Sequence, residues 1–371
     1  MANTFVTLKE IARQALPRLI DNLVFPNLVY RDFSEDFHDK GDTVRVRRPV
    51  LLQAADFDAA QGVSYQDIKE DAVEVTLDHL ATVDAAASAI ETAVNIDDLN
   101  RVFVEPAAAA LAEKINRDGL KLYQDVAACV GTAGTTPSSL DDLANARRAL
   151  NAARVPVAGR AAVWDPEADA AFTKLPAIVN AEKSGDARAL REGSIGRVFG
   201  MDHYMSQAVC SHVTGITAAT AVKVNGAVSA GATQLSIDGT SLTGKLAKGD
   251  LLKIDGKSYV VTEESAAASD NAIAAVKVFP ALPALADNTD VTLVGSHTAN
   301  LAFHPMAFAY VTRPLLNPDG QGVASYVTSW NGISLRVTRG YDQKYKRSIY
   351  SMDVLYGFKT VYPELAVRVL G

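Results

Sequence analysis

Histidines and short catalytic motifs are the first places in this chain where chemistry could occur. The six histidines are isolated, and none has the HxxxH or HExxH spacing that places two imidazoles on one zinc ion. They are His38, His79, His203, His212, His297 and His304. The sequence contains no GxSxG nucleophile turn, phosphate-binding P-loop or EF-hand calcium loop. It therefore predicts no catalytic, cofactor-binding or metal-binding residues, and a protein that is not an enzyme.

Three other patterns that could carry chemistry have simpler interpretations. Asp97-Asp98 and Asp141-Asp142 are paired carboxylates, but both pairs stand at predicted helix starts, where the helix dipole favours negative charge. Residues 193–206 are rich in glycine but lack the Lys-Ser/Thr pair of a phosphate loop, so we interpret them as turns between short strands. His304 is interpreted as a packed or hydrogen-bonded histidine rather than a ligand.

Charged side chains in an extended segment are better candidates for functional residues. Their role would be to contact another molecule. The runs 43–49 and 72–77 have strand character and enclose a polar span, which predicts a two-stranded flap over residues 41–80. A flap this long buries little of itself and needs another surface. It is either a solvated hairpin or a loop that lies on a neighbouring subunit. The candidate inter-subunit contacts are Arg45, Arg47, Arg48, Asp67, Lys69, Glu70, Asp71 and Glu74.

Helices are predicted on both sides of this flap. Residues 4–24 have apolar side chains at helical spacing, with Pro17 expected to kink or split the helix. A long helical stretch is predicted over residues 97–129. It has a joint at Glu105-Pro106, where proline suits the first turn of a helix, and Gly119 weakens its middle. A further helix is predicted from Ser139 to about Arg154, followed by a strand over residues 157–164.

The composition changes between Arg197 and Arg313, where the chain contains no arginine. Short strands recur here at regular spacing with glycine turns between them, and Asp255-Gly256 separates two apolar runs as in a tight hairpin. Strand signal flanks this stretch on both sides. We therefore predict a small barrel or sandwich, residues 216–295, inserted into another domain.

The last seventy or so residues are also rich in strands. Asn331-Gly332 separates two alternating apolar runs, which is a strong hairpin signal because both turn residues need positive φ. Tyr350, Met352, Val354, Tyr356 and Phe358 alternate with mostly small or polar residues, the pattern of a half-buried strand. The chain as a whole is thus predicted to be α+β, with a flap, a long helix, an inserted β-domain and a terminal β-module.

Composition limits the classes of protein that this chain can belong to. Its 371 residues are 48% hydrophobic and 21% charged, which is ordinary for a globular protein of two or three domains. We expect no membrane span, no signal peptide, and reduced, buried thiols at Cys129 and Cys210, which suits synthesis in a cytosol. The formal net charge of −7 argues against holding nucleic acid through the overall field, but a negative wall can enclose DNA without adhering to it.

Several stretches together resemble a known family. They are residues 300–304 through Arg313-Pro314, residues 193–206, and Leu355-Tyr356-Gly357 with Pro363-Glu364-Leu365-Ala366. In their order, in chain length and in the position of the insertion, they are similar to tailed-bacteriophage major capsid (coat) proteins of the Hong Kong 97 fold. The resemblance is greatest to the coat proteins of the Salmonella short-tailed phages, which carry an inserted domain.

This resemblance implies an assignment of parts. Residues 1–40 are the N-terminal arm and 41–80 the E-loop, which lies over the next subunit. Residues 81–134 and 326–371 form the peripheral (P) domain with its spine helix, 135–215 and 296–325 the axial (A) domain, and 216–295 the inserted barrel-like β-domain. Some relatives join a loop lysine to an asparagine covalently, but no motif around Lys69 supports that chemistry.

The resemblance also implies a structural function. The subunits would assemble as hexamers and pentamers into an icosahedral phage head, with scaffolding protein, portal and a possible decoration protein as partners. Double-stranded DNA would be enclosed without sequence-specific binding, and assembly would occur in the bacterial host cytoplasm to give the virion capsid. Two alternatives remain open at this point: an encapsulin-like storage compartment, or a soluble enzyme or binding protein that uses the β-insertion.

Overall fold

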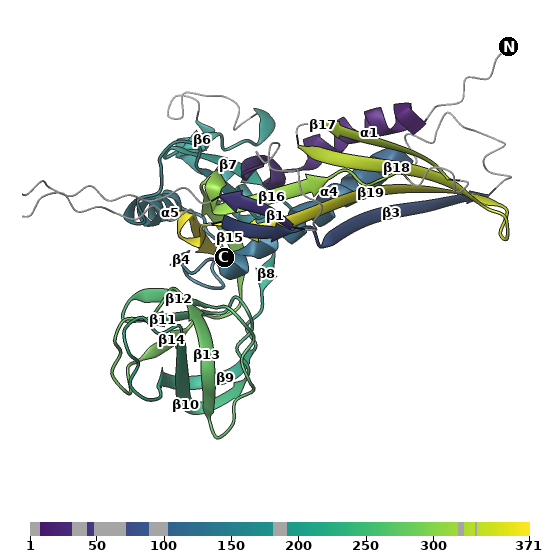
Figure 1. Cartoon of the computed structure of the whole chain (residues 1–371). Helices are drawn as coiled ribbons and strands as arrows, with labels where there is room; N and C mark the ends of the chain where they lie inside the picture. The colour runs from purple at the N-terminus through teal and green to yellow at the C-terminus, as the bar shows by residue number, and fades with distance from the viewer. Residues whose placement is uncertain are drawn as a thin grey trace, which may run out of the picture.

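The described strands form four sheets, and helices pack on two of them, the five-stranded and the seven-stranded sheet (Figure 1). The computed structural model describes residues 8–31, 43–47, 72–88, 103–180, 191–317, 323–330 and 332–371, and all statements below concern these ranges. The helices are α1 (Leu8–Asn22), α2 (Phe25–Leu28), α4 (Glu105–Leu120), α5 (Leu140–Ala152), α6 (Pro166–Thr173) and α7 (Pro176–Val179), with 3-10 turns η2 (Lys121–Asp125), η3 (Pro305–Ala307) and η4 (Pro363–Leu365).

Local sequence signals account for most of the helix boundaries. At the start of α5 the Ser139 hydroxyl accepts from the Asp142 amide, and the Asp142 carboxylate accepts from the Ser139 amide, which is a capping box. The interpretation of this carboxylate pair as a helix start is therefore confirmed, whereas Asp97-Asp98 lies outside the described residues. The helix predicted to reach residue 129 ends earlier. α4 stops at Leu120, and the 3-10 turn η2 follows as far as Asp125.

The first helix differs from the prediction at its proline. α1 runs without interruption through Pro17, so the expected split does not occur. Pro17 is exposed, as is Arg13, whose carbonyl loses its helical donor to the proline. Solvent can hydrogen-bond that carbonyl, which is why the helix tolerates the proline here.

A five-stranded antiparallel sheet packs against α1 and α4. Its order is β16-β19-β18-β17, and β3 pairs with the first part of β19. The strands are β3 (His79–Ser88), β16 (Phe308–Arg313), β17 (Ala324–Trp330), β18 (Ile333–Asp342) and β19 (Arg347–Thr360). The predicted hairpin around Gly332 (φ 73°) joins β17 to β18. Along β19, the alternating Tyr350, Met352, Val354 and Tyr356 are buried, as the sequence predicted, whereas Phe358 is only partly buried.

Phe25 occupies the centre of the largest hydrophobic core. Its ring lies 5.4–6.0 Å, centroid to centroid, from Phe303, Phe308 and Phe358. Gly119 of α4 faces the same rings, and a Cβ there would lie 2.5 Å from Cδ1 of Phe25. The glycine that weakens this helix by propensity is thus the residue that allows α4 to approach the core.

A seven-stranded mixed sheet follows beside the first. Its order is β4-β20-β15-β5-β7-β6, and β8 pairs with the start of β15. The strands are β4 (Cys129–Gly131), β5 (Ala161–Trp164), β6 (Arg197–Val198), β7 (Met201–Met205), β8 (Ser211–His212), β15 (His297–Phe303) and β20 (Ala366–Leu370). The glycine-rich stretch 193–206 contains β6 and β7 with turns around them, which confirms its interpretation as turns between short strands.

Residues 216–293 form a six-stranded antiparallel sheet of their own, with the order β14-β11-β12-β13-β10-β9. The strands are β9 (Ile216–Val224), β10 (Gln234–Gly244), β11 (Leu251–Ile254), β12 (Lys257–Val261), β13 (Ala272–Phe279) and β14 (Val291–Leu293). Asp255 and Gly256 both have positive φ and join β11 to β12, as predicted. An isolated bridge between Lys223 and Asp290 brings the first strand to the last, and Figure 1 shows the sheet standing apart from the helices.

Candidate functional site

The charged flap residues are the site candidates that the sequence singled out. β1 (Thr43–Arg47) and β2 (Ala72–Thr76) pair antiparallel, with Arg45 opposite Glu74. Arg47 lies opposite Ala72 at the end of the ladder. Only this much of the flap is described, because Arg48, Asp67, Lys69, Glu70 and Asp71 lie outside the described residues. Their contact with a neighbouring subunit stays a prediction.

The base of the flap is fixed to the body of the chain. Val75 of β2 is fully buried and packs with Ala309, Val311 and Val361. The carbonyl of Thr76 crosses Gly357 of β19 so closely that a Cβ there would collide with it. The base of the flap, as far as it is described, is therefore held firmly on the body of the chain.

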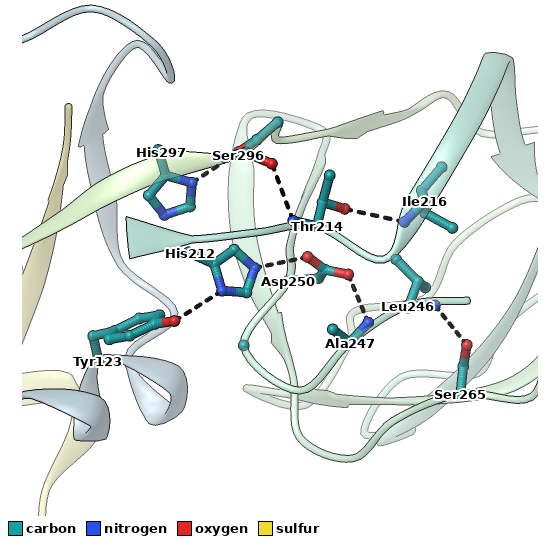
Figure 2. A network of polar contacts seen from close by, with 12 residues as sticks. Tyr123, His212, Thr214, Ile216, Leu246, Ala247, Asp250, Ser265, Ser296 and His297 are labelled. Atoms are coloured by element: carbon teal, nitrogen blue, oxygen red, sulfur yellow. Dashed lines mark hydrogen bonds and ion pairs between the residues drawn. The ribbon is translucent and has the colours of Figure 1, made fainter. Parts of the chain in front are cut away.

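A second candidate lies where the six-stranded sheet joins the seven-stranded one. β8 and β15 are the strands that lead into and out of residues 216–293, and they pair with each other, His212 opposite His297. Beyond this pair, the Thr214 amide donates to the Ser296 hydroxyl at 3.2 Å. Both connections thus start side by side, and the side chains around them form a buried polar network (Figure 2).

His212 stands at the centre of this network. Its Nε2 lies 2.7 Å from Oδ1 of Asp250, and both side chains are buried. A carboxylate only accepts, so Nε2 donates. In the neutral ring this leaves Nδ1 to accept from the Tyr123 hydroxyl, 3.0 Å away. The other Asp250 oxygen accepts from the Ala247 amide at 2.7 Å, which closes the turn 247–250.

Arg368 of β20 supplies the positive charge of the network and is fully buried. Its Nη1 donates to the Gly249 carbonyl at 2.8 Å, and its Nη2 donates to the carbonyls of Tyr123 and Val126. The guanidinium also lies 4.9 Å from the centre of the Tyr123 ring. Burial lowers the pKa of Arg368 to about 10, so it stays charged at neutral pH. One side chain thus links the 247–250 turn to η2.

His297 completes the network from the side of β15. Its Nδ1 lies 2.8 Å from the Gly295 carbonyl, and its Nε2 lies 3.5 Å from Nη1 of Arg368. Burial, reinforced by the charge of Arg368, lowers the pKa of His297 to about 4. The ring is therefore neutral at physiological pH.

The junction is also packed closely. Gly249 has φ +92°, and a Cβ there would lie 2.9 Å from Cγ of Gln124 in η2. Lys248 and Asp125 form an ion pair at the edge, with Nζ 3.1 Å from Oδ1. Ala127, Leu251, Val260, Val294 and Leu370 form an apolar cluster beside the network. Polar and apolar contacts together hold the six-stranded sheet to the body.

The order hydroxyl–imidazole–carboxylate is one that some enzymes use to activate a nucleophile. Here the hydroxyl belongs to Tyr123, which is 4% exposed, and burial raises its pKa. A groove of 610 Å³ lies elsewhere, between α1, α4 and residues 205–208, and no network residue lines it. The geometry therefore favours a structural role for these residues.

The other histidines that the structure describes lie singly. His203 is buried and accepts from the Trp164 indole at 2.9 Å. Nδ1 of His304 accepts from the Met306 amide at the start of η3, which confirms its interpretation as a hydrogen-bonded histidine. No group of three or more His, Cys, Asp or Glu side chains in the described ranges is placed to hold a metal ion. Cys129 and Cys210 are free, as expected, but only partly buried.

Sequence reasoning missed the junction network entirely. Tyr123, His212, Asp250, His297 and Arg368 have no common motif, and their partners are up to 245 positions apart. One signal was present, because His212 and His297 stand just outside the two ends of the predicted insertion. Residues at the ends of an inserted segment must lie close together in space, so this pair was a candidate contact.

Comparisons with known proteins identify the fold. No protein-family model and no curated protein matches the chain. A solved chain described as Mycobacterium phage Che8 has a TM-score of 0.52 and 20% identity over 94% of this chain and 90% of that one. The capsid structure of Cyanophage P-SCSP1u has a TM-score of 0.48 and 12% identity, over 89% of this chain and 84% of that one. The virus-like particle from Pyrococcus furiosus has a TM-score of 0.40 and 10% identity, over 97% of this chain and 98% of that one. The chain thus has a mixed α+β fold similar to that of a phage protein.

Proposed function

We propose that this chain is the major capsid protein of a tailed bacteriophage, a non-catalytic subunit of an icosahedral shell. The observation that carries the proposal is the likeness of fold to the Mycobacterium phage Che8 chain, which extends over nearly the full length of both chains. The sequence motifs that resemble tailed-phage coat proteins support it independently. So does the base of the flap, because β2 is fixed to the body through the buried Val75, as a loop that contacts a neighbour would require.

The parts of the fold are proposed to correspond to those of the Hong Kong 97 architecture. α1 belongs to the N-terminal arm (1–40), and β1 and β2 form the base of the E-loop (41–80). α4 and the five-stranded sheet provide the P domain, and the seven-stranded sheet provides the A domain. The six-stranded sheet is the inserted domain (216–295), as in the Salmonella short-tailed phage coat proteins. Its own hydrophobic core supports this division.

Assembly is proposed to proceed through hexamers and pentamers around a scaffolding protein in the bacterial host, with a portal at one vertex. The finished virion shell encloses double-stranded DNA. The net charge of −7 supports a wall that surrounds a polyanion without binding it. In the part of the chain that the structure describes, no helix has the length and apolar character needed to cross a membrane.

Co-expression with the cognate scaffolding protein tests the proposal. We expect large uniform shells by electron microscopy from the parent chain. Replacing Arg45, Arg47 and Arg48 by glutamate is expected to abolish shells while leaving a folded monomer, because charge reversal turns attraction between complementary surfaces into repulsion. The same change of charge at Lys253, Lys257 and Lys277 of the six-stranded sheet is the matched control, and its shells should form normally.

The outcomes separate the proposal from its alternatives. A parent chain that stays monomeric with its scaffold present would contradict a shell protein and favour a soluble enzyme or binding protein. Particles purified from their native source that contain protein cargo instead of DNA would favour a storage compartment of the encapsulin kind. Normal shells from the Arg-to-Glu variant would remove the flap from the list of subunit contacts but leave the capsid function standing.

A further inference from the structure

The position of His297 admits only one protonation state. Its Nδ1 is 2.8 Å from the Gly295 carbonyl and must donate to it. Its Nε2 is 3.5 Å from Nη1 of Arg368, and a guanidinium has donors but no acceptor. Nε2 must therefore keep its lone pair toward Arg368. A proton on Nε2 would place two cations face to face in a buried site.

The groups around His297 leave no easy compensation for a second positive charge. His297 faces Arg368 of β20, His212 of β8 and Asp250 of the 247–250 turn. Arg368 in turn faces Tyr123 and Asp125 of η2 and Cys129 of β4, with Lys248 at the edge. Among these groups, Asp250 is the carboxylate whose charge acts on His297. Its oxygens already accept from His212 and from the Ala247 amide. Repulsion can be relieved only by moving Arg368 or the ring away.

Moving Arg368 would loosen the junction as a whole. Its guanidinium is the donor to Gly249 on one side and to Tyr123 and Val126 on the other. The six-stranded sheet does not depend on this contact for its own packing, because residues such as Ile237, Leu252 and Val276 fill a separate core. The sheet can therefore shift without unfolding.

We propose that the junction is an acid-sensitive latch. Protonation of His297 releases Arg368, and the 247–250 turn then separates from η2 while the six-stranded sheet and the body stay folded. This inference is built on the junction geometry and does not depend on the proposed capsid function.

The direction of the pH dependence follows from His297. In the closed form its pKa is about 4, and in the open form it returns toward the ordinary value of 6.5. The open form therefore binds more protons between these two values, so the open fraction rises as pH falls from about 6.5 to about 4. Within this window we expect a rise of about tenfold for each pH unit, and no dependence above it.

Cys129 reports on the opening. It packs against the apolar cluster of the junction, and its Sγ lies 3.2 Å from the Ser258 hydroxyl of β12. In the full chain with Cys210→Ala, which leaves a single thiol, we would measure labelling of Cys129 with a pyridyl disulfide reagent that reacts at acid pH. The rate should rise about tenfold per pH unit below 6.5. Far-UV circular dichroism should stay constant over the same range.

His297→Gln tests the residue, since glutamine can accept from Arg368 and does not titrate in this range. It should remove the rise in labelling, whereas the matched control His304→Gln, at the other end of β15, should keep it. A pH-independent rate in the parent, an undiminished rise in His297→Gln, or loss of circular dichroism at the same pH as labelling would each overturn the proposal. If His297→Gln does not fold, His297→Asn replaces it in the same comparison.

Discussion

The interior of the six-stranded sheet and the junction that holds it lie only a few residues apart along the chain, yet they bury different kinds of side chain. Inside the sheet, apolar groups such as Ile237, Leu252 and Val276 fill the core. At the junction, the chain buries Arg368, Asp250 and two histidines. Leu252 and Asp250 are two positions apart and face these two environments.

The difference separates two kinds of stability. The free energy gained by burying apolar surface is non-directional and roughly proportional to the buried area. A core therefore tolerates small shifts, and its stability does not depend on pH. A buried polar network depends on every partner being present in the correct protonation state, because an unpaired buried charge is strongly unfavourable. The sheet should therefore be stable over a wide pH range, whereas its attachment should be specific and conditional.

The largest expected effect is from Arg368→Met. This change leaves the carbonyls of Gly249, Tyr123 and Val126 without their donor and Asp250 without the nearby positive charge. We expect the free energy of unfolding to fall by roughly 3–5 kcal/mol in denaturant titrations at neutral pH. Arg13→Met, at an exposed position of α1, is the control and should change stability by less than about 0.5 kcal/mol. Equal effects at the two positions would contradict a junction held by buried charge.

Leu252→Ala tests the other side of the comparison. Leu252 is fully buried, so its truncation should lower the free energy of unfolding of the six-stranded sheet by about 3 kcal/mol. Because no titratable group is removed, the loss should be the same at pH 7 and at pH 5, measured by chemical denaturation at both values. Leu316→Ala, at a side chain 89% exposed, provides the baseline. A loss that grew on acidification would show that core and junction are coupled.

The smallest effect is expected from Lys248→Ala, which removes the ion pair at the edge of the junction. The side chains of Lys248 and Asp125 are 49% and 32% exposed, so solvent screens their attraction. We expect a change of at most about 0.5 kcal/mol, and less in high salt. A double-mutant cycle with Asp125→Ala isolates the pair. A coupling as large as the Arg368 effect would mean that the edge, and not the buried network, holds the sheet.

The local parts of the fold followed from the sequence where short-range chemistry determines them. Asp255-Gly256 predicted the β11–β12 hairpin because few residues other than glycine, asparagine and aspartate accept positive φ. Ser139 followed by Asp141-Asp142 predicted the start of α5 for a similarly local reason, and the structure adds the capping box between Ser139 and Asp142. In β19, alternation predicted four of the buried side chains, Tyr350, Met352, Val354 and Tyr356, but not the buried Asp353, whose partner Arg336 lies on β18.

The junction did not follow from the sequence, because long-range contacts create it. Arg368 looks like one charge in the short apolar run 366–370, and an arginine there suggests an exposed position. β20 instead lies between β4 and β15, so the whole strand is buried. The partners of Arg368 come from η2 and from a turn 119 positions earlier in the chain. Only the packing of distant segments decides that this charge is enclosed.

The meeting of the first and last strands of the six-stranded sheet has a consequence for solubility. Exposed strand edges offer unpaired amides and carbonyls to other chains and are a common origin of aggregation. Here the bridge between Lys223 and Asp290 brings β9 to the residue before β14, and the two side chains add opposite charges at that seam. A module of this kind can be displayed in many copies at high local concentration without adjacent copies joining edge to edge.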